Sequence, residues 1–429
     1  MKTAIKEVTS ARAGDSYYQI KHSSGLNIYV YPKEGYRSAY AIIGARYGSI
    51  NTCFSRDGGE KITVPDGIAH YLEHKLFESA EGDAFTRYAE TGASANAYTS
   101  FEKTCYLFSC TDKFDESFEI LLDFVQDPYF TAQTVAKEQG IIGQEIKMYD
   151  DSPDWRVMFN MLGAMYHNHP VKIDIAGTVE TIAQITAEKL YDCYNTFYNL
   201  NNMVLCVSGN VTAEQVLKTC DRMLKPCEAH VIENFFEDEP YEIVKPYVEQ
   251  RFPVSMPIFN LGFKERADAL LNEEQLAQTE ILLSALASPT SALYRDLMDS
   301  NLINNTFSYE LFEGPGYCAV IFGGESRAPE QAAEKIKAYI AAIKRDGLSD
   351  EDFSIAKRAV YGDSISSLNS VSNIANMIAD YHFNGNELFR TIDAIASAEK
   401  ADVDARLRQM LDVDNCTLSV VRDQDAASE

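Results

Sequence analysis

The sequence predicts an α+β fold made of two homologous α/β halves. Residues 187–210 resemble 401–423, and the stretch that begins at Phe130 resembles the one that begins at Leu348. Both pairs are offset by roughly 215–220 residues and occur in the same order, as an internal repeat requires. A chain of 429 residues is also long for a single core. The segment 226–246, rich in Glu, Asp and Pro, is expected to link the two halves.

The predicted elements alternate between strands and helices. A break at Pro65-Asp66-Gly67 separates two strands from a helix, with Asp66 expected as its N-cap. Alternating or apolar runs predict strands, and helical spacing of apolar residues predicts helices. In chain order we expect strands at 26–31 and 39–47, a helix after residue 67, strands at 93–101 and 104–111, helices at 114–126, 131–149 and 187–197, and a strand at 203–207.

The composition excludes several classes of function. Hydrophobic residues make up 46% of the chain and charged residues 24%, which is an ordinary globular balance. The net charge of −26 repels phosphate backbones and anionic lipids, so nucleic acids and membranes are not expected partners. The N-terminus lacks a signal-peptide core, and no 18-residue apolar run occurs. Nine cysteines without Cys-x-x-Cys spacing predict reduced, buried thiols and a cytoplasmic protein.

The pentapeptide His70-Tyr71-Leu72-Glu73-His74 is the most informative motif. On a helix, residues three and four apart share a face, so both imidazoles can reach one ion while Glu73 points at a water on it. His-x-x-Glu-His is the inverted form of a common zinc-hydrolase motif. The plain alternative is a surface helix that happens to carry two histidines.

A hydrolytic zinc site needs a third protein ligand besides the two histidines. Glu138 and Glu145 lie seven residues apart on the predicted helix 131–149 and therefore share a face. One of them can bind the metal while the other accepts a hydrogen bond from a ligating histidine. The alternative is that both are ordinary solvated glutamates.

Three motifs in order resemble the insulinase/pitrilysin family of zinc peptidases, which includes the mitochondrial processing peptidases. They are the pentapeptide with the following Lys75–Glu78, then "GASANAYTS", then "KEQGIIGQEIKMYDDSP". The resemblance covers residues 26–210, and the second half is similar to the family's non-catalytic repeat. It implies two halves that each form a mixed sheet with helices on one face, as a zinc-binding catalytic domain at 1–225, the linker 226–246, and a metal-free domain at 247–429.

The resemblance also implies a role for each motif residue. His70, His74 and Glu145 would bind Zn²⁺, Glu138 would support them from the second shell, and Glu73 would be the general base for a zinc-activated water. The implied activity is endoproteolysis of unfolded peptides, which would add as an extra β-strand. The substrate-binding residues would be Ala95, Asn96, Ala97, Tyr98 and, near the substrate, His169. The alternative for residues 95–98 is an internal strand, and the alternative for His169 is a plain loop.

Two departures shape the expectation about partners. At the positions that match the pentapeptide and Glu145, the second half has "SPTSAL" at 288–293 and Ile365, so only the first half is expected to hold the ion. Family members that act alone usually carry an Arg and a Tyr seven residues apart in the second half. Here Met298 and Asn305 occupy those positions, and Arg295 and Tyr309 are out of spacing.

The missing pair predicts that this chain is the zinc-bearing subunit of a two-subunit enzyme. Its partner would be a sister chain that supplies the Arg and the Tyr, or else a second copy of the same chain. The competing interpretation is a structural or assembly subunit that keeps the fold without turnover. The intact Glu73 favours catalysis, because a site that only binds metal has no need of a base there.

Overall fold

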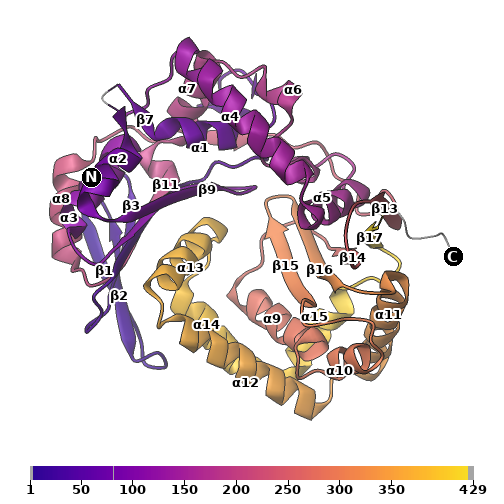
Figure 1. Cartoon of the computed structure of the whole chain (residues 1–429). Coiled ribbons are helices and arrows are strands. Elements are labelled where there is room, and N and C mark those ends of the chain that lie inside the picture. The colour runs from indigo at the N-terminus through magenta and orange to yellow at the C-terminus, as the bar shows by residue number, and fades with distance from the viewer. Residues whose placement is uncertain (1–2, 81, 424–429) are drawn as a thin grey trace. The chain divides into compact units, whose positions relative to one another are not determined.

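The computed structural model describes residues 3–80 and 82–423. The chain forms two compact units, and each unit takes segments from both halves of the sequence (Figure 1). The first unit consists of Met1–Ile146, Asp174–Phe235 and Ile365–Phe389. The second consists of Lys147–Ile173, Phe236–Ser364 and Arg390–Glu429.

A seven-stranded mixed sheet forms the centre of the first unit. Its strands are β1 Ala4–Ser10, β2 Asp15–Lys21, β3 Asn27–Pro32, β4 Ala39–Ala45, β9 Ser94–Thr99, β10 Thr104–Cys110 and β11 Met203–Gly209. They lie in the order β1-β2-β3-β11-β4-β10-β9, so β9 is an edge strand. β3 and β11 run parallel, and the other neighbours are antiparallel. Short strands β5 Cys53–Arg56, β6 Ile62–Thr63 and β12 Ile232–Asn234 form a separate sheet, and β7 Glu78–Ser79 pairs with β8 Gly82–Asp83.

The second unit repeats the core of this sheet with five strands. They are β13 Tyr247–Arg251, β14 Ile258–Lys264, β15 Ser308–Gly314, β16 Tyr317–Glu325 and β17 Cys416–Arg422, in the order β13-β17-β14-β16-β15. When the core strands of each sheet are numbered in chain order, starting from β3 or from β13, both sheets have the same spatial order: first, fifth, second, fourth, third. The first and fifth strands run parallel in both. This shared topology confirms the predicted duplication and the α+β fold.

Helices follow the strands in the same sequence in both repeats. The first repeat contributes α1 Ile68–Leu76, α2 Ala84–Thr91, α3 Phe114–Phe124, α4 Ala132–Asp150, α5 Pro153–Met165, α6 Val179–Ile182, α7 Ala187–Phe197 and α8 Ala213–Met223. The second contributes α9 Glu273–Ala287, α10 Ala292–Asp299, α11 Pro329–Asp346, α12 Asp350–Ser367, α13 Val371–Asn384, α14 Leu388–Ser397 and α15 Lys400–Gln409. Two short 3₁₀ helices occur at Pro170–Lys172 and Leu200–Asn202.

The two repeats exchange one helix each. Within the first unit, α13 packs on β4 and β11 although it belongs to the second half of the sequence. Within the second unit, α5 from the first half packs on β14 and β17. Helices of the same repeat, such as α1 and α3, cover the sheet face that carries Tyr106, whereas α13 covers the face of Gly44. In the first unit the expectation of helices on one face therefore holds for α1 and α3, while α13 covers the opposite face.

Matching glycines allow the exchanged helices to approach. A Cβ atom at Gly44 in β4 would lie 3.0 Å from the ring of Phe383 on α13. A Cβ atom at Gly262 in β14 would lie 2.5 Å from Met165 on α5. Gly44 precedes Ala45, which pairs with Met203, and Gly262 precedes Phe263, which pairs with Cys416. Because Met203 and Cys416 are equivalent positions of the repeat, the two glycines are equivalent as well. Each glycine thus provides the space that an exchanged helix needs.

One detail of the sequence comparison was wrong. The segment 288–293 lies at the junction of α9 and α10 and does not correspond to the pentapeptide helix. The helix that follows the second core strand is α1 in the first repeat and α9 in the second, so α9 is the counterpart of α1. α9 contains no histidine. The inference that the first half holds the ion is unchanged.

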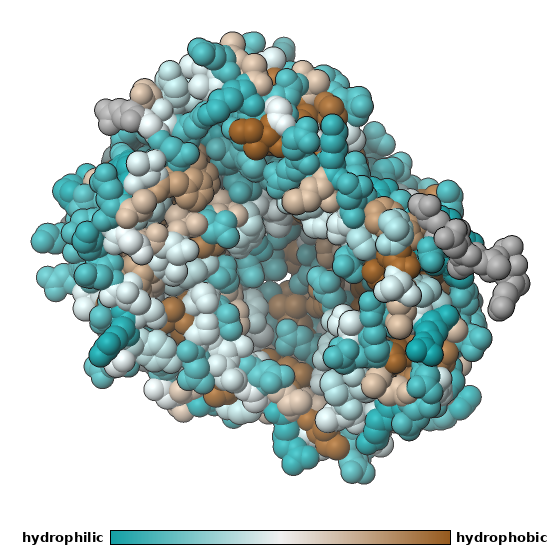
Figure 2. Space-filling view, viewed as in Figure 1, coloured by the Kyte–Doolittle hydropathy of each residue, from teal (hydrophilic) through white to brown (hydrophobic). Residues whose placement is uncertain are grey.

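The remaining general properties agree with the composition. All nine cysteines are free thiols, and seven of them are buried, including Cys105, Cys206 and Cys318. The face drawn in Figure 2 is mostly hydrophilic, with apolar residues in small groups. Among the residues that the structure describes, no helix is both long and apolar enough to cross a bilayer.

Candidate metal centre

The pentapeptide forms the middle of α1, and its helix begins at a strained position. Gly67 is the N-cap with φ of 87°, and a Cβ atom there would lie 2.3 Å from the carbonyl oxygen of Ala176. Only glycine fits such a left-handed and crowded site. The predicted capping role of Asp66 was therefore wrong, since no side chain caps this helix. Every residue of α1 except His74 is buried, and the partly exposed His74 borders a cavity.

His70, His74 and Glu145 come together from α1 and α4. The ligand atoms of the three side chains lie within 4.8 Å of one another. His70 Nε2 is 3.7 Å from one carboxylate oxygen of Glu145, and His74 Nε2 is 3.3 Å from the other. Tetrahedral ligands about 2.0–2.1 Å from a zinc ion lie roughly 3.3 Å apart. Two imidazole nitrogens and one carboxylate at this spacing fit zinc and leave a fourth position open.

Glu138 orients the second histidine. His74 Nδ1 lies 3.1 Å from Glu138 Oε1, and Glu138 is buried. This contact places the proton on Nδ1 and leaves the Nε2 lone pair directed at the centre. Burial lowers the pKa of His74, but hydrogen bonds to Glu138 and Glu145 outweigh it and raise the pKa to about 10. The carboxylates that hold a proton here equally favour a metal cation.

His70 has a different environment from His74. Burial and the nearby His74 lower its pKa to about 4, so its imidazole is neutral. Its Nδ1 atom is buried and has no hydrogen-bond partner among the described residues. A neutral imidazole whose Nε2 faces a carboxylate is a metal ligand in the required protonation state.

Glu73 lies beside the ligand group and is not part of it. Its carboxylate accepts a hydrogen bond of 2.6 Å from the hydroxyl of Thr99, at the end of β9. Burial raises the pKa of Glu73 to about 7, against the opposing effect of Thr99. A cavity of 360 Å³ adjoins Glu73 and His74. A carboxyl group with a pKa near 7 can both take up and release a proton at neutral pH.

The edge strand β9 borders the same cavity through Asn96 and Ala97. The N–H of Ala97 donates to its neighbour's side chain, Asn96 Oδ1, at 2.9 Å. This N–H therefore points away from β10 and does not take part in the hydrogen bonds between the two strands. Ala95 pairs with Phe108, and Tyr98 pairs with Cys105 and hydrogen-bonds its thiol.

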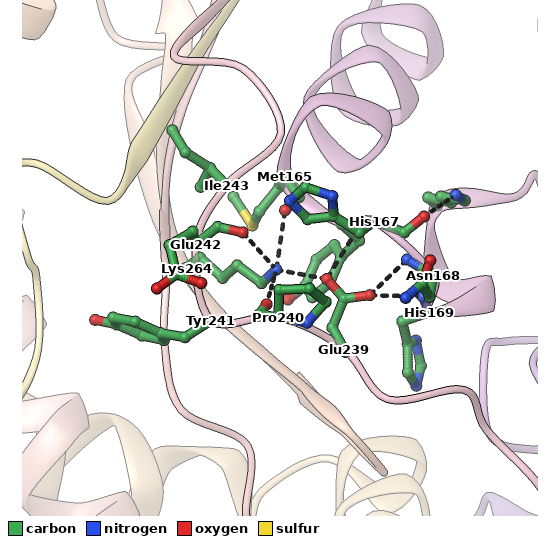
Figure 3. Close-up of polar contacts among 12 residues, drawn as sticks. Met165, His167, Asn168, His169, Glu239, Pro240, Tyr241, Glu242, Ile243 and Lys264 are labelled. Atoms are coloured by element: carbon green, nitrogen blue, oxygen red, sulfur yellow. Dashed lines mark hydrogen bonds and ion pairs between the residues drawn. The ribbon is translucent and has the colours of Figure 1, made fainter.

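His169 belongs to the second unit and has structural contacts (Figure 3). Its side chain is buried, Nε2 lies 3.0 Å from the carbonyl oxygen of Pro315, and Nδ1 accepts from the N–H of Val171. Its ring packs against Phe236 and Tyr317. The group of possible metal ligands consists of His70, His74 and Glu145, and His169 is not among them.

Arg295 and Tyr309 also lie in the second unit, on α10 and β15. Tyr309 is half-buried and hydrogen-bonds Ser284 of α9. Arg295 acts electrostatically on Tyr339 of α11. The two side chains therefore have separate sets of neighbours.

Sequence reasoning missed Thr99 and Tyr71. Thr99 follows directly after the motif "SANAY" and shares a strand face with Ala97, which was the available signal. The hydroxyl of Tyr71 reaches the backbone of α4, and no pattern in the sequence indicated that contact.

Comparison with known proteins adds independent information. The family model for the insulinase peptidases (peptidase family M16) matches residues 63–179, and the model for the M16 inactive domain matches residues 184–360. An uncharacterised zinc protease of Bacillus subtilis, YmfH, is 39% identical over 424 residues, covering 97% of this chain and 99% of that protein.

Two further similarities concern structure and assembly. An M16-like peptidase from Alicyclobacillus acidocaldarius superposes with a TM-score of 0.90 at 34% identity and 98% coverage of both chains. The beta subunit of the mitochondrial-processing peptidase of Caenorhabditis elegans is 29% identical over 196 residues, covering 44% of this chain and 42% of that protein.

Proposed function

This chain belongs to the insulinase (M16) family and is a zinc protease, and we propose that it hydrolyses unfolded peptides with Glu73 as the general base. One observation carries the proposal. His70, His74 and Glu145 present three zinc-type ligands within 4.8 Å, and Glu73 lies on the same helix as the two histidines. We assign residues 1–225 as the catalytic domain and 247–429 as its metal-free counterpart.

The chemistry divides among the side chains of the site. Zinc, when bound by His70, His74 and Glu145, supplies Lewis acidity and a nucleophilic water at neutral pH. Glu73 takes a proton and returns it to the departing amine, a task that suits a pKa of about 7. Thr99 holds the Glu73 carboxylate in place through its 2.6 Å hydrogen bond. Glu138 orients the imidazole of His74.

We propose that the substrate adds to β9 as a further strand. β9 is the edge of its sheet and borders the cavity beside Glu73. Main-chain pairing gives affinity with little demand on sequence, which suits unfolded segments. Residues 95–98 would supply the backbone groups, with the N–H of Ala97 released from Asn96. We also propose that His169 lies near the substrate.

We further propose that the active enzyme has two subunits. An electrostatic donor to the transition state is typically worth a factor of about 10²–10³ in rate. Met298 and Asn305 occupy the positions where such donors are expected, and both are exposed. A sister chain with the Arg and the Tyr, or a second copy of this chain, would complete the site. Nine free thiols suit the reducing cytoplasm.

Zinc analysis together with peptide cleavage tests the catalytic proposal. Glu73→Gln should keep its zinc while the cleavage rate of a quenched peptide falls by about 10²–10⁴-fold. Glu265→Gln is the matched control, because Glu265 is also buried with a pKa raised to about 7, but lies in the second unit. Cleavage by Glu73→Gln at the wild-type rate would reject Glu73 as the base.

The same assay with and without a candidate sister chain tests the second subunit. Activity that rises on mixing supports the two-subunit enzyme. Equal activity in both preparations removes the need for a sister chain. Zinc binding without turnover in either preparation favours the alternative of a structural or assembly subunit.

A further inference from the structure

Tyr71 lies inside the pentapeptide and reaches across to the helix that carries the two glutamates. Its side chain is completely buried, and its hydroxyl donates to the carbonyl oxygen of Val135 in α4. The backbone N–H of Gln139 hydrogen-bonds the same hydroxyl oxygen. The hydroxyl therefore contacts two backbone groups of α4 that lie four residues apart.

These two groups are normally partners of each other. In a regular α-helix the N–H of residue 139 donates to the carbonyl of residue 135. A side chain that enters this ladder fixes or bends the helix at that turn. Tyr71 thus fastens α4 at residues 135–139 by a specific hydrogen-bond pattern as well as by packing.

The fastened turn contains Glu138, the partner of His74. The distance of 3.1 Å between Glu138 Oε1 and His74 Nδ1 depends on the position of this turn of α4 along the axis of α1. A further link, from Lys137 to Glu78 at 2.9 Å, involves a mostly exposed lysine, and such pairs contribute little. Tyr71 is the buried link at the same turn.

We propose that Tyr71 is a positioning residue of the zinc centre, whose hydroxyl holds the turn 135–139 so that Glu138 orients the His74 imidazole. The inference rests on the proposed zinc chemistry and assigns no reacting group to Tyr71. The phenol acts on the metal through Glu138 and His74. Its loss changes the affinity for zinc before it changes the fold.

The first test is the zinc affinity of the full-length Tyr71→Phe variant, measured by competition with a chromophoric chelator. Loss of an outer-shell partner typically weakens metal binding 10–100-fold, and we expect about 10-fold for this more remote group. Val135 and Gln139 lie in a continuous stretch of α4, where they can satisfy each other without the hydroxyl, so the apo protein should keep its melting temperature. Tyr88→Phe is the matched control, because its buried hydroxyl has no partner among the described residues.

A double-mutant cycle with Glu138→Gln shows whether Tyr71 acts through Glu138. The double variant should bind zinc no more weakly than Glu138→Gln alone. Additive losses, or a Tyr71→Phe affinity within twofold of wild type, would overturn the inference. A wild-type chain that binds no zinc would instead refute the proposed function, so the two failures are distinguishable.

Discussion

Replacing Lys264 with methionine should destabilise the contact between residues 165–169 and residues 239–242 in the second unit. The ammonium group of Lys264 is buried and donates to the carboxylate of Glu239 at 2.6 Å (Figure 3). It also donates to the carbonyl oxygens of Met165, Pro240 and Glu242 at 3.0, 2.7 and 3.3 Å. Methionine keeps most of the side-chain volume and removes all four bonds.

The other end of this cluster is the carboxylate of Glu239. It accepts from the backbone N–H groups of His167, Asn168 and His169 at 2.9, 2.7 and 2.8 Å. Burial raises its pKa, but the bonds to Lys264 and to these three amides outweigh that effect and lower the pKa from 4.5 to about 2. A difference of this size corresponds to roughly 3 kcal/mol. Breaking a buried pair typically costs about 3–5 kcal/mol, which agrees.

Hydrogen exchange of the amides at 167–169 measures this contribution locally. A loss of about 3 kcal/mol predicts exchange roughly 100-fold faster in Lys264→Met. Lys335→Met is the control, because Lys335 lies on the surface of the same unit and pairs with the exposed Asp296. Its effect should stay below about 1 kcal/mol. Exchange in Lys264→Met within threefold of wild type would refute the reasoning.

The pH dependence supplies a second check on the same cluster. The pKa of Glu239 is lower in the folded protein than in the unfolded chain, so its contribution is complete above pH 4.5. As pH falls from 4.5 toward 2, the unfolded chain binds the proton first and the contribution is lost. The protection factors of the amides at 167–169, which compare their exchange with that of the unfolded chain at the same pH, should fall in that window for wild type and change less in Glu239→Gln.

Three further outcomes are expected. Ala97→Pro removes the outward N–H of β9 and should raise KM for peptides about 10-fold with a smaller change in kcat, and an unchanged KM in steady-state assays would count against strand addition. Glu145→Gln should weaken zinc binding more than Glu138→Gln in chelator competition, and the reverse order would exchange their roles. Burial lowers the pKa of His382 to about 4, so the unfolded chain binds a proton first and the stability of the fold decreases as pH drops from 6.5 to 4. The melting temperature of His382→Asn should fall less than that of wild type over this pH range. An identical pH dependence of the two melting temperatures would contradict this.

Much of the fold and the zinc ligands was predictable because the signals are local or repeated. Helical spacing identified α1 and α4, and the structure places the predicted His70, His74 and Glu145 together. The choice between Glu138 and Glu145 was not a matter of spacing. It came from the family resemblance, and the contact of Glu138 with His74 Nδ1 supports it. Internal similarity predicted the duplication, which the common strand order confirms.

The sequence alone could not predict contacts that depend on tertiary packing. The N-cap of α1 is Gly67 and not the predicted Asp66. Residue 67 must be glycine because the carbonyl group of Ala176, more than a hundred residues later, leaves no space for a side chain there. The exchange of α5 and α13 leaves only two small traces, Gly44 and Gly262, and each is an ordinary glycine in a strand. Sequence similarity reports homologous segments and does not report which unit they join.

The centre assigns different tasks to three glutamates by giving each a different partner. Glu145 faces two imidazole nitrogens, which makes it the group that shares a cation with them. Glu138 faces the Nδ1 atom of His74 and so acts on the ring, at one remove from the ion. Glu73 has a hydroxyl partner in Thr99 and a buried environment that raises its pKa to about 7, which suits a group proposed to exchange a proton near neutral pH. Because the environment and not the residue type separates these tasks, conservative changes of Thr99 or Tyr71 should disturb the chemistry although neither residue touches the reacting atoms.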